Sequence, residues 1–297
     1  MLKFLALLIV TVGLVAPVVA QEKKIWVVHS AAAGGIISSA NNAVQEELEK
    51  SGYKVEVIRT TSCKTAESWL KSNAEKPVVM TYHAEEQAYL NNFPKSDDAC
   101  DIGFNKEKLL TIVSVTYTTV CSMKPADEAM RHFFAGGHRV GVTYYAAVNQ
   151  LLAKGIMDSF KINSRVVRLQ GNSNLIQALV SGDVDFTIQS NATSAIKAGA
   201  TCFLTTAPKE YAHKTGMRSL EDFDPKNAWI NRGHVFTYIG MNLQNKKEIT
   251  DIAVRTVNTN PIVQALLNNN AYKSGLAAGQ SETAQWKMID DHIKGYK

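Results

Sequence analysis

Few residues of this chain have the types and spacing that catalysis requires. The sequence contains no HExxH, GxSxG or phosphate-binding P-loop motif. Asp183 and Asp185 are two residues apart on a predicted strand, so they share one face and could act as an acid/base pair of the glycosidase kind. The favoured alternative is structural, with Asp183 capping a turn and Asp185 buried. No nucleophile with a neighbouring base can be identified, and we predict a protein that is not an enzyme.

A glycine-bearing turn near the start of the chain has the properties of an anion site. A short apolar strand at 25–29 runs through Ser30-Ala31-Ala32-Ala33-Gly34-Gly35 into a helical pattern. Free backbone N–H groups at a helix start, together with the helix dipole, attract an anion such as a carboxylate. Glycine also lets a ligand approach the backbone closely. We predict ligand contacts at Ser30, Ala33, Gly34 and Gly35; the alternative is a tight turn without a ligand.

Further candidates follow other strands, at the edge where α/β lobes bind ligands. Small-molecule pockets commonly use aromatic rings with a hydroxyl group and neutral amides. From three strand ends we predict ligand contacts at Tyr82, His83, Tyr144, Tyr145, Gln189, Ser190 and Asn191. The alternatives are that at least one of the paired tyrosines packs in the core and that the histidine is structural or solvated. Arg139 and Arg168 are the cationic candidates for a carboxylate, but a surface position is the favoured interpretation of both.

The four cysteines, Cys63, Cys100, Cys121 and Cys202, are too far apart for a zinc knuckle, and no metal site or cofactor is expected. In an oxidising compartment an even number favours disulfides, and four cysteines allow three pairings. We favour Cys63 with Cys100, because both follow early strands at one edge of the first sheet. Cys121 with Cys202 would then join two hinge segments. The alternative is buried free thiols.

Strand and helix patterns alternate along the chain, which predicts parallel sheets covered by helices. Apolar and β-branched runs predict strands at 25–29, 55–58, 77–82, 109–120, 139–142, 165–169, 184–188, 202–206 and 235–241. Helical spacing is found at 38–51, 65–74, 145–159, 173–181, 192–198, 246–257, 261–270 and 280–295. The long strand at 109–120 would carry the chain to a second α/β lobe, and the strand at 202–206 would bring it back. The fold class is therefore α/β, with two Rossmann-like lobes joined by two crossing strands.

The first 20 residues have the pattern of a secretion signal. Lys3 is followed by an apolar stretch of about twelve residues, and Val18 and Ala20 are the small residues of a cleavage site. We predict cleavage after Ala20 and release into the periplasm; the alternative is an uncleaved membrane anchor. The chain has 45% apolar residues and a net charge of +5 without a basic cluster, so a substantial core is expected and nucleic acid is not an expected partner.

The segment Gly171 to Phe186, with its Leu179-Val180-Ser181-Gly182 and Asp183-Val184-Asp185-Phe186, resembles the solute receptors of tripartite tricarboxylate transporters, the tricarboxylate-binding or Bug family. The stretch 260–263 followed by Gly275-Leu276 is also similar. The resemblance implies a type II periplasmic binding protein fold and an aromatic cleft residue at Tyr238. The chain departs from the family at Ile36, where an Asp usually stands, and at 141–145, where Gly-Ser pairs are usual.

Together these observations predict a monomeric receptor that closes over a small carboxylate and delivers it to membrane permease subunits, a partner that the resemblance implies. The predicted divisions are a signal at 1–20, a first lobe at 21–120 and 207–297, and a second lobe at 121–206. A related receptor for an amino acid or another nitrogenous solute is an alternative. An exported hydrolase with an atypical site is a further one.

Overall fold

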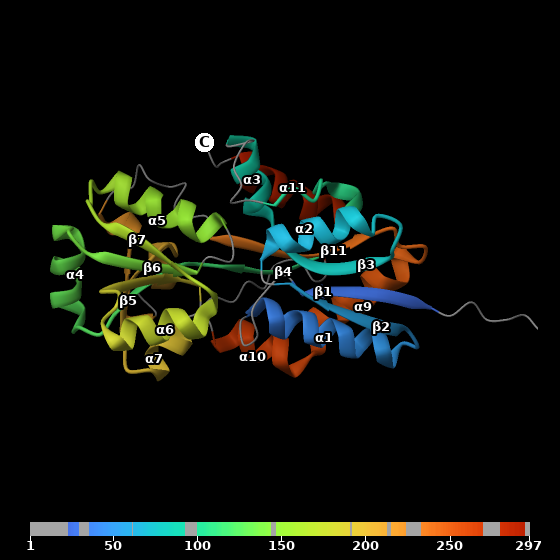
Figure 1. Cartoon of the computed structure of the whole chain (residues 1–297), viewed down its shortest axis with the longest axis horizontal. Coiled ribbons are helices and arrows are strands. Elements are labelled where there is room, and N and C mark those ends of the chain that lie inside the picture. Colours follow the sequence, from blue (N-terminus) through green and yellow to red (C-terminus); the bar gives the residue numbers. More distant parts are fainter. Residues whose placement is uncertain are drawn as a thin grey trace, which may run out of the picture.

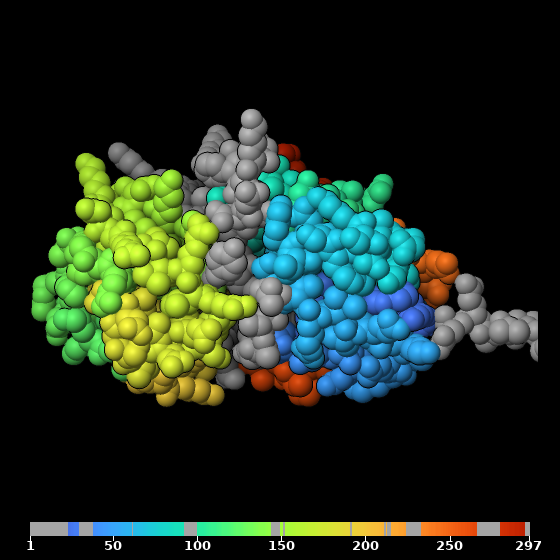
Figure 2. Space-filling view, viewed as in Figure 1, coloured from blue at the N-terminus to red at the C-terminus, as the bar shows by residue number. Residues whose placement is uncertain are grey.

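The computed structural model describes residues 23–29, 36–60, 62–92, 100–143, 147–190, 192–212, 215–223, 233–269 and 280–294. They form two α/β lobes side by side, which Figure 2 shows as two rounded masses. Each lobe has its own sheet, one of five strands and one of six. Within the described residues, no helix is both long and apolar enough to cross a bilayer.

The first lobe contains the start and the end of the chain. Its sheet has the order β2-β1-β3-β11-β4. β1, β2 and β3 are parallel, and β11 is antiparallel to both of its neighbours. Its elements are β1 (Lys24–His29), α1 (Ile36–Lys50), β2 (Lys54–Arg59), α2 (Cys63–Ser72), β3 (Val78–His83), α3 (Ala84–Asn92), a 3-10 turn (Lys106–Lys108), β4 (Leu109–Thr116), β11 (His234–Met241), α9 (Lys246–Thr259), α10 (Pro261–Asn269) and α11 (Glu282–Lys294).

Helices cover both faces of this sheet. α1, α9 and α10 pack on one face, and α2, α3 and α11 lie on the other (Figure 1). β4 is an edge strand, yet all eight of its residues are buried, because α9 and α11 both contact it. The Gln285 side chain of α11 accepts a hydrogen bond from the backbone N–H of Ile112 at 2.8 Å. This contact satisfies a donor that an edge strand would otherwise leave unpaired.

The second lobe is the middle of the chain. Its sheet has the order β10-β9-β5-β8-β6-β7, in which β8, β6 and β7 are parallel and β5 is antiparallel to β8 and β9. α4 and α5 pack on one face, and α6 and α7 on the other. Its elements are β5 (Thr119–Ser122), α4 (Ala126–Ala135), β6 (Arg139–Thr143), α5 (Ala147–Ser159), β7 (Arg165–Leu169), α6 (Gly171–Ser181), β8 (Phe186–Gln189), α7 (Ala192–Lys197), β9 (Thr201–Thr205), α8 (Lys209–Ala212), β10 (Arg218–Ser219) and a 3-10 turn (Leu220–Asp222).

Local sequence signals explain several element ends. Ser62 caps α2 reciprocally with Thr65: the Ser62 hydroxyl accepts from the Thr65 backbone, and the Thr65 hydroxyl accepts from the Ser62 backbone. α6 ends at Gly182, whose φ of 79° lies in the left-handed region that glycine adopts without strain. Both signals are readable in the sequence.

The crossing between the lobes differs in part from the prediction. The strand expected at 109–120 is divided at residues 117–118, where the chain passes from β4 of the first sheet to β5 of the second. The segment 202–206 does not return the chain, because β9 pairs with β5 inside the second sheet. The second sheet then continues to β10 at Arg218–Ser219, beyond the predicted boundary at 206. The chain re-enters the first sheet at His234.

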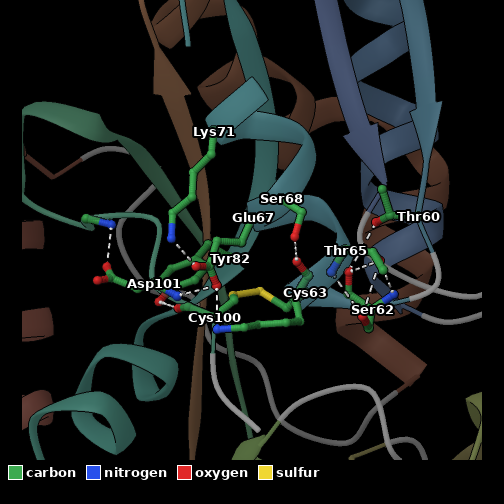
Figure 3. Close-up of a disulfide and its surroundings, with 12 residues drawn as sticks. Thr60, Ser62, Cys63, Thr65, Glu67, Ser68, Lys71, Tyr82, Cys100 and Asp101 are labelled. Carbon is green, nitrogen blue, oxygen red and sulfur yellow. Dashed lines mark hydrogen bonds and ion pairs between the residues drawn. A yellow bond between two sulfur atoms is a disulfide. The ribbon is translucent and has the colours of Figure 1, made fainter. Parts of the chain in front are cut away.

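The four cysteines pair as predicted, Cys63 with Cys100 and Cys121 with Cys202. The first bond lies in the first lobe, beside Tyr82 and Glu67 (Figure 3). The second joins directly opposed residues of β5 and β9, so it fastens two strands of one sheet rather than two hinge segments.

Candidate functional site

The polar ends of the first sheet lie at one edge. β1, β3 and β4 finish there, and β11 begins there, because β11 runs antiparallel to its neighbours. This first-lobe edge contains His29, His83, Thr116 and His234. It is the edge at which α/β sheets bind ligands.

The second sheet presents its own polar edge at the same crossover. Thr119 begins β5 opposite Gln189, the last residue of β8, and opposite Thr205, the last residue of β9. Thr143 ends the neighbouring strand β6. Because the chain passes from Thr116 to Thr119 in three residues, the first-lobe edge and this second-lobe edge meet at the crossover.

Thr118 ties the crossover to both edges. Its side chain lies 2.7 Å from His234 Nε2, and its backbone N–H donates to the Thr206 hydroxyl at 2.9 Å. The backbone N–H of Thr206 in turn donates to the Thr118 carbonyl. Helices α3 and α5 also touch across the lobes. The two edges are therefore held together at one end, which is the arrangement of a hinge.

Several buried side chains at the first-lobe edge have polar atoms without a hydrogen-bond partner. His29 is fully buried, and neither of its ring nitrogens has a partner among the described residues. The same is true of Asn41 Oδ1 in α1 and of Ser114 Oγ in β4. Burial, with a smaller contribution from the Arg59 charge, lowers the pKa of His29 to about 4. Buried polar atoms are normally paired, so their concentration here marks this edge as a candidate binding surface.

A second group at this edge consists of His83, Glu85 and His234. His83 Nδ1 lies 3.9 Å from Glu85 Oε2, and His83 retains 17% of its side-chain surface. Burial lowers the pKa of His83 and lowers that of His234 to about 4. Burial opposes ionisation of Glu85, but contact with His292 and the nearby histidines outweighs it, so the pKa of Glu85 lies below its ordinary value. The group combines neutral imidazoles with a buried carboxylate.

The second-lobe edge is neutral in its described polar side chains. Gln189 is buried, and its amide donates to Thr187 Oγ1 at 3.2 Å and lies 3.9 Å from the sulfur of Cys121, while its Oε1 has no partner in the described part of the chain. Asn149 of α5 donates to Thr143 at 2.6 Å, and its Oδ1 is likewise unpartnered there. The Cys121–Cys202 bond thus helps to position Gln189.

The predicted ligand contacts fall into three groups. His83 and Gln189 lie at the two edges, and Ser190 directly follows β8. Tyr82 and Tyr238 instead pack in the first-lobe core, where their hydroxyls donate to the carbonyls of Cys100 at 3.4 Å and Ala40 at 2.5 Å. Both side chains are buried in this conformation. The remaining contacts lie outside the described residues: Ser30, Ala33, Gly34, Gly35, Tyr144, Tyr145 and Asn191.

The acid/base alternative is not favoured by the geometry. Asp185 Oδ2 accepts from the backbone N–H of Arg139 at 2.9 Å, and Asp183 accepts from the Ser181 hydroxyl at 2.7 Å. Both aspartates precede β8, at the end of the strand opposite to Gln189. They therefore have structural contacts far from the crossover. Asp185 is half-buried rather than buried, and Arg139 and Arg168 are exposed.

Four residues of these two edges were not predicted from the sequence: Asn41, Glu85, Asn149 and His234. Asn149 follows the predicted tyrosine pair by a few residues in the sequence, and Glu85 follows His83 by two residues, so proximity to predicted contacts was an available signal. His234 had no such signal, because only the antiparallel pairing of β11 with β3 brings it to this edge.

Known proteins resemble this chain in structure but not in sequence. No family model matches the chain, and no curated protein matches it. Solved structures do match. Periplasmic binding protein BugD aligns with a TM-score of 0.71 at 13% identity over 92% of this chain and 95% of BugD. MatC from Rhodopseudomonas palustris with bound malate aligns with a TM-score of 0.71 at 13% identity, over 92% of this chain and 97% of MatC. An R. palustris protein with adipate aligns with a TM-score of 0.63 at 13% identity, over 91% of this chain and 94% of that protein.

These alignments cover both lobes and nearly the whole of each chain. The fold is therefore the two-lobed type II fold seen in Bug-type and TctC-type periplasmic binding proteins. BugD is described as a periplasmic binding protein, and a TctC protein from Polaromonas, which aligns with a TM-score of 0.53, is described as a solute binding protein.

Proposed function

We propose that this protein is a periplasmic receptor that binds a small carboxylate between its two lobes and delivers it to the permease subunits of a tripartite membrane transporter. The observation that carries this proposal is the meeting of two polar sheet edges at a single crossover, in a fold shared with binding proteins solved with malate and adipate. The two disulfides are consistent with an exported chain, and we propose cleavage after Ala20 and a monomeric mature protein.

The proposed mechanism is closure of the lobes about the crossover. A ligand favours the closed form only if it binds that form more tightly, so both edges must contribute contacts. The second-lobe edge offers the amide groups of Gln189 and Asn149. Their unpartnered oxygens suit a hydroxyl group of the ligand, and the second N–H of Asn149, which donates its other N–H to Thr143, suits a carboxylate. We propose that the turn at 30–35 supplies the backbone donors of the first lobe, with Tyr144, Tyr145 and Asn191 completing the other wall.

The experiment is a thermal denaturation series with a panel of dicarboxylates, tricarboxylates, aromatic acids, amino acids, sugars and polyamines. A ligand at about 100 times its dissociation constant adds about 2.7 kcal/mol, which raises the melting temperature by several degrees. A rise with one class of carboxylates supports the proposal. A rise only with amino acids or other nitrogenous solutes would keep a receptor and reject the carboxylate.

The hydrolase alternative has a separate test. Turnover of a substrate by the purified protein, abolished by Asp183→Asn or Asp185→Asn, would favour an enzyme. We expect no turnover, because both aspartates are engaged in structural hydrogen bonds away from the crossover.

A further inference from the structure

We propose that His83, Glu85 and His234 form a binding site for one divalent transition metal ion of the Zn²⁺ type, at the first-lobe edge beside the crossover. Each residue offers one ligand atom, and the three atoms lie within 4.8 Å of one another. Two imidazoles and one carboxylate form a common three-residue zinc set. The proposal concerns the protein itself and does not depend on which solute the receptor binds.

Unsatisfied atoms point to this site independently of the clustering. His83 Nδ1, Glu85 Oε2 and His234 Nδ1 are each buried and without a hydrogen-bond partner in the described part of the chain. Glu85 and His234 are fully buried as residues. Leaving one buried polar atom unpaired costs about 1–3 kcal/mol, and a carboxylate oxygen costs more. A cation coordinated by all three atoms would satisfy them at once.

The other atoms of the same side chains are already held in place. Glu85 Oε1 accepts from the backbone N–H of Val235 at 2.6 Å and lies 2.5 Å from His292 Nε2. His234 Nε2 lies 2.7 Å from the Thr118 hydroxyl. If Nε2 is the protonated nitrogen that donates to Thr118, then Nδ1 of His234 has a free lone pair. Metal-binding histidines characteristically use the second ring nitrogen in this way, to fix the tautomer and the ring.

The geometry fits a small transition metal after a modest contraction. Tetrahedral ligands at about 2.0–2.1 Å from Zn²⁺ are about 3.4 Å apart. His83 Nδ1 and Glu85 Oε2 are 3.9 Å apart, and no separation in the group exceeds 4.8 Å. Two nitrogen ligands disfavour Ca²⁺ and Mg²⁺, which prefer oxygen. Three protein ligands leave a fourth position for water, and the partial exposure of His83 provides a path of entry.

The sequence did not predict a metal site. The expectation that no metal site is present rested on the spacing of Cys and His along the chain. This group is instead assembled by two strands and the first turn of α3. His83 ends β3, Glu85 lies in the first turn of α3, and His234 begins β11. The antiparallel pairing of β3 with β11 brings them together.

The test is calorimetric titration of Zn²⁺ into the chain purified without a histidine tag and treated with a chelator. We expect one Zn²⁺ per chain. His83→Ala should weaken binding by more than about 100-fold, which exceeds the 10–100-fold typical of losing an outer contact. Thr118→Val, which removes only such an outer contact, should weaken it by about 10-fold. Cobalt substitution provides a spectroscopic readout, since a low-symmetry site with nitrogen ligands gives visible absorption that His83→Ala should abolish.

The matched control is His132→Gln in the second lobe. His132 also has a buried, unpartnered Nδ1, and its ring centroid lies 4.0 Å from that of His138, so it is the competing pair of imidazoles. His132→Gln should leave Zn²⁺ affinity unchanged. The proposal is overturned if the wild-type protein takes up no Zn²⁺, or if His132→Gln weakens binding while His83→Ala does not. Should His83→Ala fail to fold by circular dichroism, Glu85→Gln, which keeps the side-chain shape, replaces it.

Discussion

The first-lobe edge holds titratable side chains at the ends of β1 and β3 and at the start of β11, whereas the second-lobe edge holds amides and hydroxyls at the ends of β6 and β8 and in α5. His29, His83 and His234 belong to the first group, and Asn149 and Gln189 to the second. A buried ionisable side chain depends strongly on its partners, because burial opposes its charged form, while a neutral amide can exchange a protein contact for a ligand contact at little cost. We infer that the first-lobe side chains keep their positions when a ligand binds, whereas the second-lobe amides can exchange protein contacts for ligand contacts.

The largest expected effects on stability come from removing the two disulfides, one in each lobe. The Cys63–Cys100 bond closes 37 residues of chain in the first lobe, and Cys121–Cys202 closes 81 in the second. In the chain-entropy model these loops correspond to roughly 3.8 and roughly 4.5 kcal/mol of stabilisation. We expect the variant that replaces Cys121 and Cys202 by Ala to lose about 0.7 kcal/mol more stability than the variant that replaces Cys63 and Cys100. Urea unfolding under non-reducing conditions measures both, and a larger loss in the first lobe would contradict the ranking.

Removing the buried carboxylate should cost more than removing the buried amide. Glu85→Ala leaves the Val235 N–H without its acceptor and His292 without its carboxylate, so we expect a loss of about 3 kcal/mol in chelator-treated protein. Gln189→Ala removes weaker contacts to Thr187 and Cys121 and should cost about 1 kcal/mol. The free energy of unfolding of each variant decides the point. Equal losses would show that the edges do not differ in this way.

The pH dependence of stability should come from the first-lobe edge. The pKa of His29 is lowered from 6.5 to about 4 in the folded chain, so the unfolded chain binds more protons between these pH values. The stability associated with His29 is therefore complete above about pH 6.5 and is lost as the pH falls towards 4. We expect it to contribute a loss on the order of 2 kcal/mol between pH 7 and pH 4.5.

Unfolding of His29→Leu at those two pH values checks this contribution. The variant should lose less stability on acidification than the wild type, and Gln189→Ala should lose as much as the wild type. If His29→Leu loses as much stability between the two pH values as the wild type does, His29 is not a source of the pH dependence.

The sequence predicted the architecture well because its main signals are local. Alternating strand and helix patterns gave both α/β lobes, and the crossing within 109–120 was identified from its β-branched residues. Helix α3 was missed because it begins at Ala84 directly after β3, without a turn residue, and has few apolar residues. Helix α4 at 126–135 was also missed.

The site was less predictable than the fold. His83 and Gln189 were predicted at strand ends and are the last residues of β3 and β8, and Ser190 directly follows β8. Tyr82 was expected at the same edge, but alternate residues of a strand point to opposite faces, and its ring packs against Phe104 in the core. Of the neighbours of His83, Glu85 lies two residues further along in a helix that was missed. His234 begins β11, the last strand along the chain, so only strand pairing could reveal it.

The most direct measurement of the central claim is calorimetric titration of malate and adipate into the wild-type protein, Gln189→Ala and Asp183→Ala. The account predicts saturable binding of a carboxylate, weakened about 10-fold by Gln189→Ala through loss of one ligand hydrogen bond, and unchanged by Asp183→Ala at the opposite strand end. Binding that Gln189→Ala leaves intact and Asp183→Ala abolishes would contradict a site between the two edges.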